Sequence, residues 1–172
     1  GAFHIHIDPG VVSLLRDECQ RVGISKPLVV SDAGVRAAGV LDQALVSLRG
    51  LPHAVFDATP SNPTEAAVRA AVAVLKAERC DGLVAVGGGS SIDLAKGVAI
   101  AATHDGPLKT YATIEGGSPR ISANRIRASD ASDIGRPSGR YVGDMEPGIG
   151  VNPVVARQLA GQDDALLIAP RQ

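Results

Sequence analysis

The chain has 172 residues, enough for one domain with its own core and too few for two large ones. Hydrophobic residues make up 45% of the sequence but aromatic residues only 2%, so we expect a core of Val, Leu, Ile and Ala. A formal net charge of −1, with acidic and basic residues interspersed, gives no electrostatic reason to expect nucleic acid or an anionic membrane as partner, and leaves small molecules as the expected partners.

Short apolar runs alternate with helix-like segments over the first hundred residues. Gly and Pro punctuate the pattern, and the helix-like segments carry apolar residues at helical spacing. In chain order the pattern predicts a strand at 3–8, a helix at 11–23, a strand at 26–32, a helix at 33–50, a strand at 53–60, a helix at 62–80, a strand at 81–89 and a helix at 90–104.

The helix at 62–80 has the most complete start signal. Asn62 is the expected N-cap, Pro63 suits the first helical position, and Glu65 at the third position can reach back toward the cap. For the helix at 90–104 we expect Ser90 to be the first residue, directly after the glycines.

Strands that are apolar on both faces and joined through helices predict an α/β fold, with a parallel sheet covered by helices on both sides. In such sheets, ligands bind beyond the carboxyl ends of the strands. Three polar or Gly-rich segments follow the predicted strands there, at residues 31–34, 57–62 and 87–91.

Three consecutive glycines, Gly87 to Gly89, separate an apolar strand from a helix. Glycines let the chain turn tightly, and the free N–H groups and positive dipole end of the following helix favour phosphate. The spacing matches neither the dinucleotide fingerprint G-x-G-x-x-G nor the P-loop. Close packing of helix on strand is the alternative explanation of the glycines, and the residues alone leave both open.

A cytoplasmic location is expected, because no apolar run could span a bilayer and the N-terminal stretch lacks the features of a secretory signal. Cys19 and Cys80 fit no metal-binding spacing, which favours free thiols in a reducing compartment, although a disulfide remains an alternative.

The stretch "GGGSSIDLAKGVAI", preceded by an apolar strand and by "TPSNPTEAAV", resembles the N-terminal nucleotide-binding domain of the iron-containing alcohol dehydrogenases, which have a dehydroquinate synthase-like fold. The family pattern G-G-G-S-x-x-D-x-A-K is filled by Gly87, Gly88, Gly89, Ser90, Asp93, Ala95 and Lys96. The resemblance runs from about residue 3 to residue 121. It implies a Rossmann-like sheet and an oxidoreductase that uses NAD or NADP and a metal ion.

The resemblance also implies roles for individual residues. Gly87, Gly88, Gly89, Ser90 and Ser91 would hold the pyrophosphate of the dinucleotide, and Asn62 would line the cofactor cleft. Asp32 would face the adenosine ribose, where a carboxylate favours NAD over NADP. Asp93 belongs to the motif, although an ion pair with Lys96 or a favourable interaction with the helix dipole would explain these two residues equally well.

The resemblance ends near residue 121, so we expect a nucleotide-binding domain at 1–121 and an atypical tail at 122–172. Residues 122–150 carry few apolar residues, and the last segment suggests a short helix followed by a strand at 165–170. The helical domain in which the family binds iron or zinc is missing, so no catalytic residue or metal ligand is assigned. An out-of-frame continuation explains the tail better than a genuine short protein does.

We therefore expect the chain to be a truncated alcohol dehydrogenase that binds the dinucleotide and, at family level, acts on a small alcohol or aldehyde. The alternatives are an activity like that of maleylacetate reductase, and a non-catalytic nucleotide-binding or interaction module. Homo-oligomerisation is left open.

Overall fold

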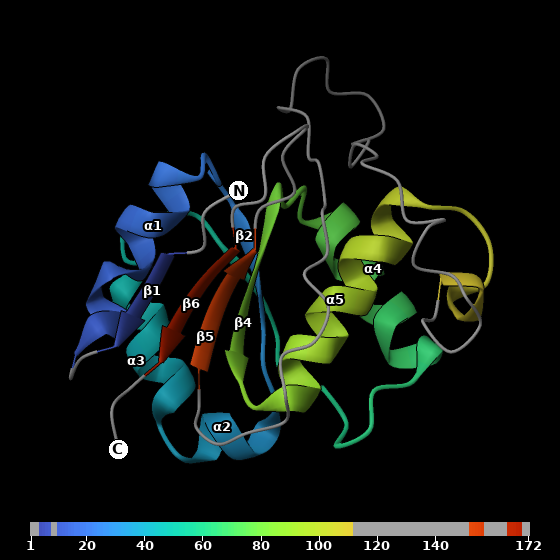
Figure 1. Cartoon of the computed structure of the whole chain (residues 1–172), viewed down its shortest axis with the longest axis horizontal. Coiled ribbons are helices and arrows are strands. Elements are labelled where there is room, and N and C mark those ends of the chain that lie inside the picture. Colours follow the sequence, from blue (N-terminus) through green and yellow to red (C-terminus); the bar gives the residue numbers. More distant parts are fainter. Residues whose placement is uncertain (1–3, 8–9, 112–151, 157–164, 170–172) are drawn as a thin grey trace.

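The computed structural model describes residues 4–7, 10–111, 152–156 and 165–169. Its centre is a six-stranded sheet with the order β1-β6-β5-β4-β2-β3 (Figure 1). The strands are β1 (His4–Ile7), β2 (Pro27–Val30), β3 (Ala54–Phe56), β4 (Gly82–Gly87), β5 (Asn152–Ala156) and β6 (Ala165–Ala169). The four strands predicted before residue 100 are thus confirmed.

The sheet is parallel except for one strand. β2 pairs in parallel with both β3 and β4, with Val29 opposite Val55 on one side and Val84 on the other. β5 runs antiparallel to β4 and to β6, while β6 pairs in parallel with β1. The predicted parallel sheet with helices on both faces is confirmed for β2, β3 and β4, and the antiparallel β5 comes from the segment after residue 121, for which no strand direction was predicted. Only residues 157–164 connect β5 to β6, and this is too short for the crossover that parallel neighbours need.

The final segment gives a mixed result. The predicted strand at 165–170 is confirmed as β6, but β5 lies where a short helix was expected. β5 contains Val154 and Val155, whose branched Cβ favours extended backbone over helix. The proposed domain boundary at residue 121 and the poorly patterned stretch at 122–150 lie outside the described residues.

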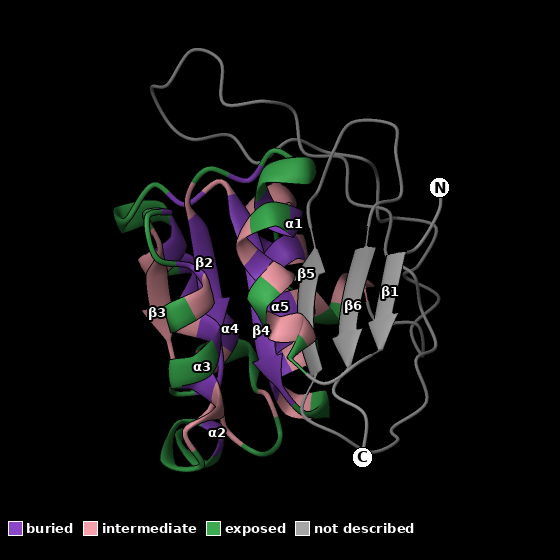
Figure 2. Cartoon of the chain, turned by 90° about the vertical axis from the view of Figure 1, so that its left-hand side faces the viewer, coloured by how far each residue is buried: buried purple, intermediate pink, exposed green. Residues whose placement is uncertain are grey.

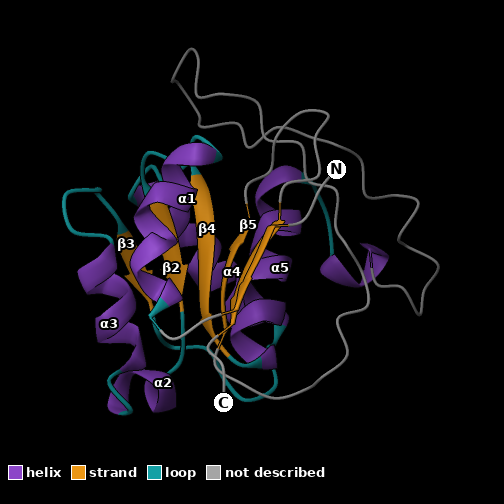
Figure 3. Cartoon of the chain, turned by 60° about the vertical axis from the view of Figure 1, so that its left-hand side comes forward, coloured by secondary structure: helices purple, strands orange, loops and turns teal. Residues whose placement is uncertain are grey.

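Helices cover both faces of the sheet (Figures 1 and 3). On one face lie α1 (Leu15–Arg21), preceded by the 3-10 turn η1 (Val11–Leu14), and α3 (Val40–Ser47), preceded by α2 (Ala33–Ala37). On the other lie α4 (Glu65–Ala77) and α5 (Gly89–Thr103), which is followed by the 3-10 turn η2 (Leu108–Tyr111). In the described parts of the chain, no helix is both long enough and apolar enough to span a membrane.

Alternating side chains of the central strands fill two cores. Val29, Val84 and Val86 pack with Leu15 and Leu41 against α1 and α3. The intervening residues, Leu28, Val30, Leu83 and Ala85, pack against α4 and α5 with Val68, Leu75, Leu94 and Val98. Figure 2 shows β2 and β4 buried along their length. The two cores fix the positions at which the strands end and the helices begin.

Two helix boundaries differ from the prediction. The single helix expected at 33–50 is divided, because Gly39 adopts a left-handed φ of 75° between α2 and α3. α4 begins at Glu65, and its N-cap is Thr64 rather than Asn62: the Thr64 Oγ1 accepts a hydrogen bond from the Ala67 N–H. Thr64 has the extended backbone of an N-cap, and its hydroxyl reaches the third N–H of the helix.

Candidate functional site

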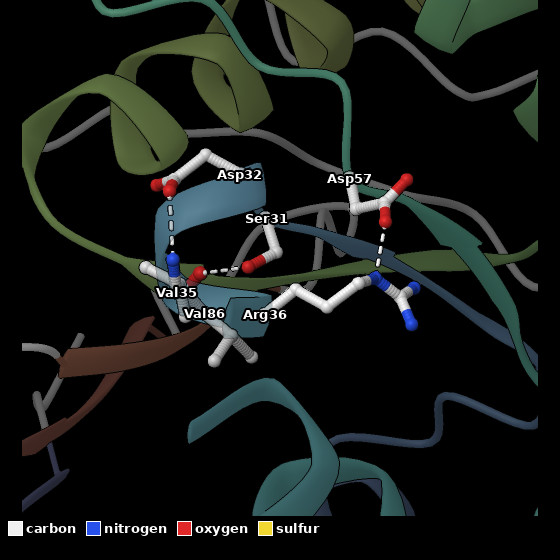
Figure 4. A network of polar contacts seen from close by, with 6 residues as sticks. All are labelled: Ser31, Asp32, Val35, Arg36, Asp57 and Val86. Carbon is white, nitrogen blue, oxygen red and sulfur yellow. Dashed lines mark hydrogen bonds and ion pairs between the residues drawn. The ribbon is translucent and has the colours of Figure 1, made fainter. Parts of the chain in front are cut away.

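Three turns meet at the carboxyl edge of the sheet, as the strand order requires. They follow β2 at residues 31–34, β3 at residues 57–62 and β4 at residues 87–91. Serine hydroxyls join them: Ser31 Oγ donates to the Val86 carbonyl at 2.7 Å (Figure 4), and Ser90 Oγ donates to the Ser61 carbonyl at 2.6 Å. The three predicted clusters therefore form one connected site.

The three glycines of the turn differ in whether the structure requires glycine at their positions. Gly87 has a φ of 148°, and a Cβ there would lie 2.6 Å from Ser91 Oγ, so the turn itself requires glycine. Gly88 and Gly89 are exposed, and a Cβ on either would meet no atom within 4 Å. Close packing thus explains neither of these two, in contrast to Gly97, whose Cβ would lie 2.7 Å from Val68. The open space in front of Gly88 and Gly89 suits a ligand that approaches the backbone.

The N-terminus of α5 differs from those of α2 and α4 at the same edge. α2 is capped by Asp32 and α4 by Thr64, each through a side-chain oxygen. α5 starts at Gly89, one residue earlier than predicted, and its N-cap Gly88 provides no side-chain hydrogen bond. The first N–H groups of a helix have no partner within the helix, and the dipole there attracts negative charge. The geometry therefore suits an anionic group such as phosphate.

Asp32 lies beside the glycine turn. Its Oδ1 accepts the Val35 N–H at 2.9 Å, which caps α2 (Figure 4), and its Oδ2 accepts the hydroxyl of Ser91 at 3.1 Å. A Cβ on Gly87 would lie 3.3 Å from Asp32 Oδ2. Two hydrogen bonds hold this half-buried carboxylate in place, so the negative charge sits at a defined position next to the turn.

The remaining predicted residues lie at the margin of the site. Asn62 is exposed on the segment that Ser90 joins to α5. Asp93 is exposed and forms an ion pair with Lys96 at 3.4 Å, one of the two structural explanations expected for this pair. For Asn62 and Asp93, as for Asp32 and residues 87–91, a role in cofactor binding stays a prediction.

Two features of this edge were missed by the sequence analysis. The guanidinium of Arg36 on α2 forms an ion pair with Asp57, which directly follows β3 (Figure 4). Thr59 is 7% exposed, its N–H donates to the Ser31 carbonyl at 3.3 Å, and its Oγ1 finds no hydrogen-bond partner in the described part of the protein. The position of Asp57 after a strand was a usable signal, whereas the pairing with Arg36 required the fold.

Other reactive groups lie apart from this edge. Burial raises the pKa of the Cys19 thiol to about 12 and that of Cys80 to about 11, so both thiols stay protonated near neutral pH. Both are free cysteines, as expected. Over the ranges that the structure describes, no three His, Cys, Asp or Glu side chains gather in a way that could hold a metal ion.

Comparison with known proteins decides the family. Residues 3–128 match the family model described as iron-containing alcohol dehydrogenase. The chain belongs to the iron-containing alcohol dehydrogenase family. This confirms the resemblance read from the glycine motif, and with it the oxidoreductase class of the relatives.

Individual relatives agree with the family model. The chain is 66% identical over 119 residues to 4-hydroxybutyrate dehydrogenase of Cupriavidus necator, covering 69% of this chain and 31% of that protein. It is 42% identical over 135 residues to 1,3-propanediol dehydrogenase of Klebsiella pneumoniae, covering 74% of this chain and 35% of that protein. A crystal structure of 1,3-propanediol oxidoreductase superposes with a TM-score of 0.61 at 42% identity, covering 63% of this chain and 29% of the other. This chain therefore spans about a third of the length of the curated relatives it matches.

Proposed function

We propose that the chain binds the pyrophosphate of a nicotinamide dinucleotide at the N-terminus of α5. The open space in front of Gly88 and Gly89 is the observation that carries the proposal, since nothing in the packing requires glycine there. A phosphate in this space would accept hydrogen bonds from the first N–H groups of α5 and lie at the positive end of the helix dipole. The match to the iron-containing alcohol dehydrogenase family supports this assignment.

We propose NAD rather than NADP as the preferred dinucleotide. Asp32 lies next to the glycine turn, where it could accept hydrogen bonds from the hydroxyl groups of the adenosine ribose. Its negative charge would repel a 2′-phosphate. The buried Thr59 hydroxyl adds a hydrogen-bonding group without a partner among the described residues at the same edge. Replacement of Asp32 by Gly should raise the affinity for NADP relative to NAD.

In the reaction we propose for the whole enzyme, a bound NAD supplies the acceptor for a hydride from the carbon of an alcohol. The residues of this chain bind and orient the dinucleotide: α5 holds the pyrophosphate, and Asp32 the ribose. The described residues do not fit a metal ion, so no step through a metal is derived from them.

The substrate class is proposed from the relatives. The 66% identity to a 4-hydroxybutyrate dehydrogenase supports a short hydroxy acid with a primary alcohol as the substrate of the whole enzyme. An unsaturated oxo-acid, as for a maleylacetate reductase, is the alternative within the same reaction class. The free, buried cysteines support a cytoplasmic location.

Calorimetric titration of the purified chain with NAD tests the proposal. We expect saturable binding that is lost in Gly88→Val, because the side chain would fill the space reserved for the phosphates. The backbone at Gly88, with φ −85° and ψ −163°, is open to any residue, so the variant should fold. Equal binding by Gly88→Val and the unchanged chain would refute the site, and absence of binding to a folded chain would refute the function.

A further inference from the structure

The ion pair between Arg36 and Asp57 lies at the part of the site where the adenosine end of the dinucleotide is expected. Arg36 is on α2, one turn beyond Asp32, and Asp57 follows β3, the neighbour of β2. Figure 4 shows the Arg36 side chain extending away from Asp32 toward Asp57, to whose Oδ2 the Arg36 Nε donates. The side chains are 44% and 38% exposed, so a ligand in solution could reach either group.

Few charged side chains surround this ion pair, and together they carry a net negative charge that disfavours phosphate. Residues 31–39 and 57–64 contain three charged side chains: Asp32, Arg36 and Asp57. A guanidinium is the preferred protein partner of a phosphate group, because its planar N–H groups match the phosphate oxygens. Arg36 is thus the one group in these two segments that would attract a 2′-phosphate, and the carboxylate of Asp57 at its Nε already compensates its charge.

We infer that Asp57 is a positioning residue for the choice of cofactor: by holding the Arg36 guanidinium, it withholds that cation from a phosphate on the adenosine ribose. The inference rests on the proposed function, in that it requires a dinucleotide at this edge. It adds a second determinant to Asp32. Asp32 acts by repelling the 2′-phosphate directly, whereas Asp57 acts through Arg36.

The test is the ratio of NADP to NAD affinity in four forms of the full chain, measured by calorimetry at low salt. The forms are the unchanged chain, Asp57→Asn, the double variant Arg36→Gln with Asp57→Asn, and the control Glu78→Gln. Glu78 pairs with Lys26 at 3.1 Å at the opposite edge of the sheet, so the control removes an equivalent paired carboxylate at a distance.

We expect Asp57→Asn to raise the NADP to NAD ratio about tenfold, as a charge-assisted hydrogen bond to phosphate becomes available. NAD affinity should change little. The double variant should return to the original ratio, and Glu78→Gln should leave it unchanged. Thermal melting of all four forms checks that each is folded, because an exposed ion pair contributes little to stability.

Two results would overturn the inference while leaving the proposed function intact. One is an unchanged ratio in Asp57→Asn with normal NAD binding. The other is the same rise in the double variant, since the effect would then not run through Arg36. Failure of the unchanged chain to bind NAD would instead refute the proposed function, and this inference with it.

Discussion

The amino edge of the sheet and the start of α5 at the carboxyl edge differ in whether a side chain accepts the backbone N–H groups. At the amino edge, Asp81 accepts hydrogen bonds from the N–H groups of Ser25 and Lys26, and from the Ser25 hydroxyl. At the carboxyl edge, the N-cap of α5 is Gly88, which makes no side-chain hydrogen bond. Side chains of the protein accept these N–H groups at the amino edge, as Asp32 and Thr64 do for α2 and α4 at the carboxyl edge, whereas the N-terminus of α5 has no side-chain cap.

The glycines at the two ends of β4 also differ in their surroundings. Gly82 starts β4 at the amino edge, and a Cβ there would lie 2.5 Å from Cγ1 of Ile24. Gly88 follows β4 at the carboxyl edge, and its Cβ would meet nothing within 4 Å. The glycine at the start of β4 is therefore tightly packed, whereas the glycine after its end faces open space. A glycine that packing requires should matter for stability, and one that it does not require should matter for binding.

Gly82→Ala should have the largest effect. Ile24 is 1% exposed, and three of its atoms lie within 2.8 Å of the new methyl group, so the core must shift to admit it. We expect the free energy of unfolding to fall by about 3 kcal/mol, the upper part of the usual range for overpacking. Urea denaturation followed by circular dichroism measures this loss, and a change below 1 kcal/mol would contradict the packing reason.

Asp81→Ala should have the next largest effect. The substitution removes the acceptor of the Ser25 and Lys26 N–H groups, at 2.9 Å and 2.8 Å. Hydrogen bonds to a charged acceptor contribute more than neutral ones, but these are partly open to water, so we expect a loss of about 2 kcal/mol. The matched control is Asp93→Ala, which removes an exposed carboxylate and should cost below about 0.5 kcal/mol. Equal losses in the two variants would argue against a structural role for Asp81.

Gly88→Ala should leave stability almost unchanged, within about 0.5 kcal/mol, because its methyl group enters open space. Its affinity for NAD should fall, since the methyl group narrows the space in front of the α5 N–H groups. Urea denaturation and NAD calorimetry on the same preparation separate the two effects. A stability loss as large as that of Gly82→Ala would contradict the inference that Gly88, unlike Gly82, is not required by packing.

The smallest expected effect is the pH dependence of stability that arises from the buried thiols of Cys19 and Cys80. Burial raises the pKa of Cys80 to about 11 and that of Cys19 to about 12, from an ordinary value of 9.0. At pH 8 both should react slowly with Ellman's reagent in the folded chain and rapidly in urea. Unfolded thiols ionise near pH 9 and folded ones only at higher pH, so the unfolding free energy should decrease as the pH rises above 9.

Gly88→Cys is the matched comparison for the thiol measurement, because it places a sulfhydryl in the open space at the carboxyl edge. This thiol should react at the rate of an exposed cysteine in the folded chain. Rapid modification of Cys80 without denaturant would show that the amino edge is less well closed than its packing indicates.

Strong local signals made most of the fold predictable. Apolar runs such as that of β4 identified the strands, and helical spacing identified α1, α4 and α5. The errors occurred where two local signals competed. Asn62 and Thr64 are both residue types that favour the N-cap, and the helix begins directly after Thr64, whose side chain accepts the Ala67 N–H. Gly39 lies inside a stretch whose apolar residues have helical spacing, yet it divides α2 from α3.

The candidate site could be located but not described in advance. The rule that ligands bind at the carboxyl ends of parallel strands is enough to place residues 31–34, 57–62 and 87–91 together from the sequence. It did not show that Ser91 donates to Asp32, or that Arg36 pairs with Asp57. These contacts join residues 59 and 21 positions apart in sequence, and no spacing pattern encodes such pairings.

The sequence by itself determined the family, the α/β class and the position of the glycine turn, because these depend on local patterns of residue type. Only the tertiary structure showed that close packing does not require Gly88 and Gly89, since that depends on which atoms from distant segments surround each Cβ. It also decided the direction of β5 and the partner of Arg36, because strand pairing and ion pairing are set by neighbours that the chain brings together only on folding.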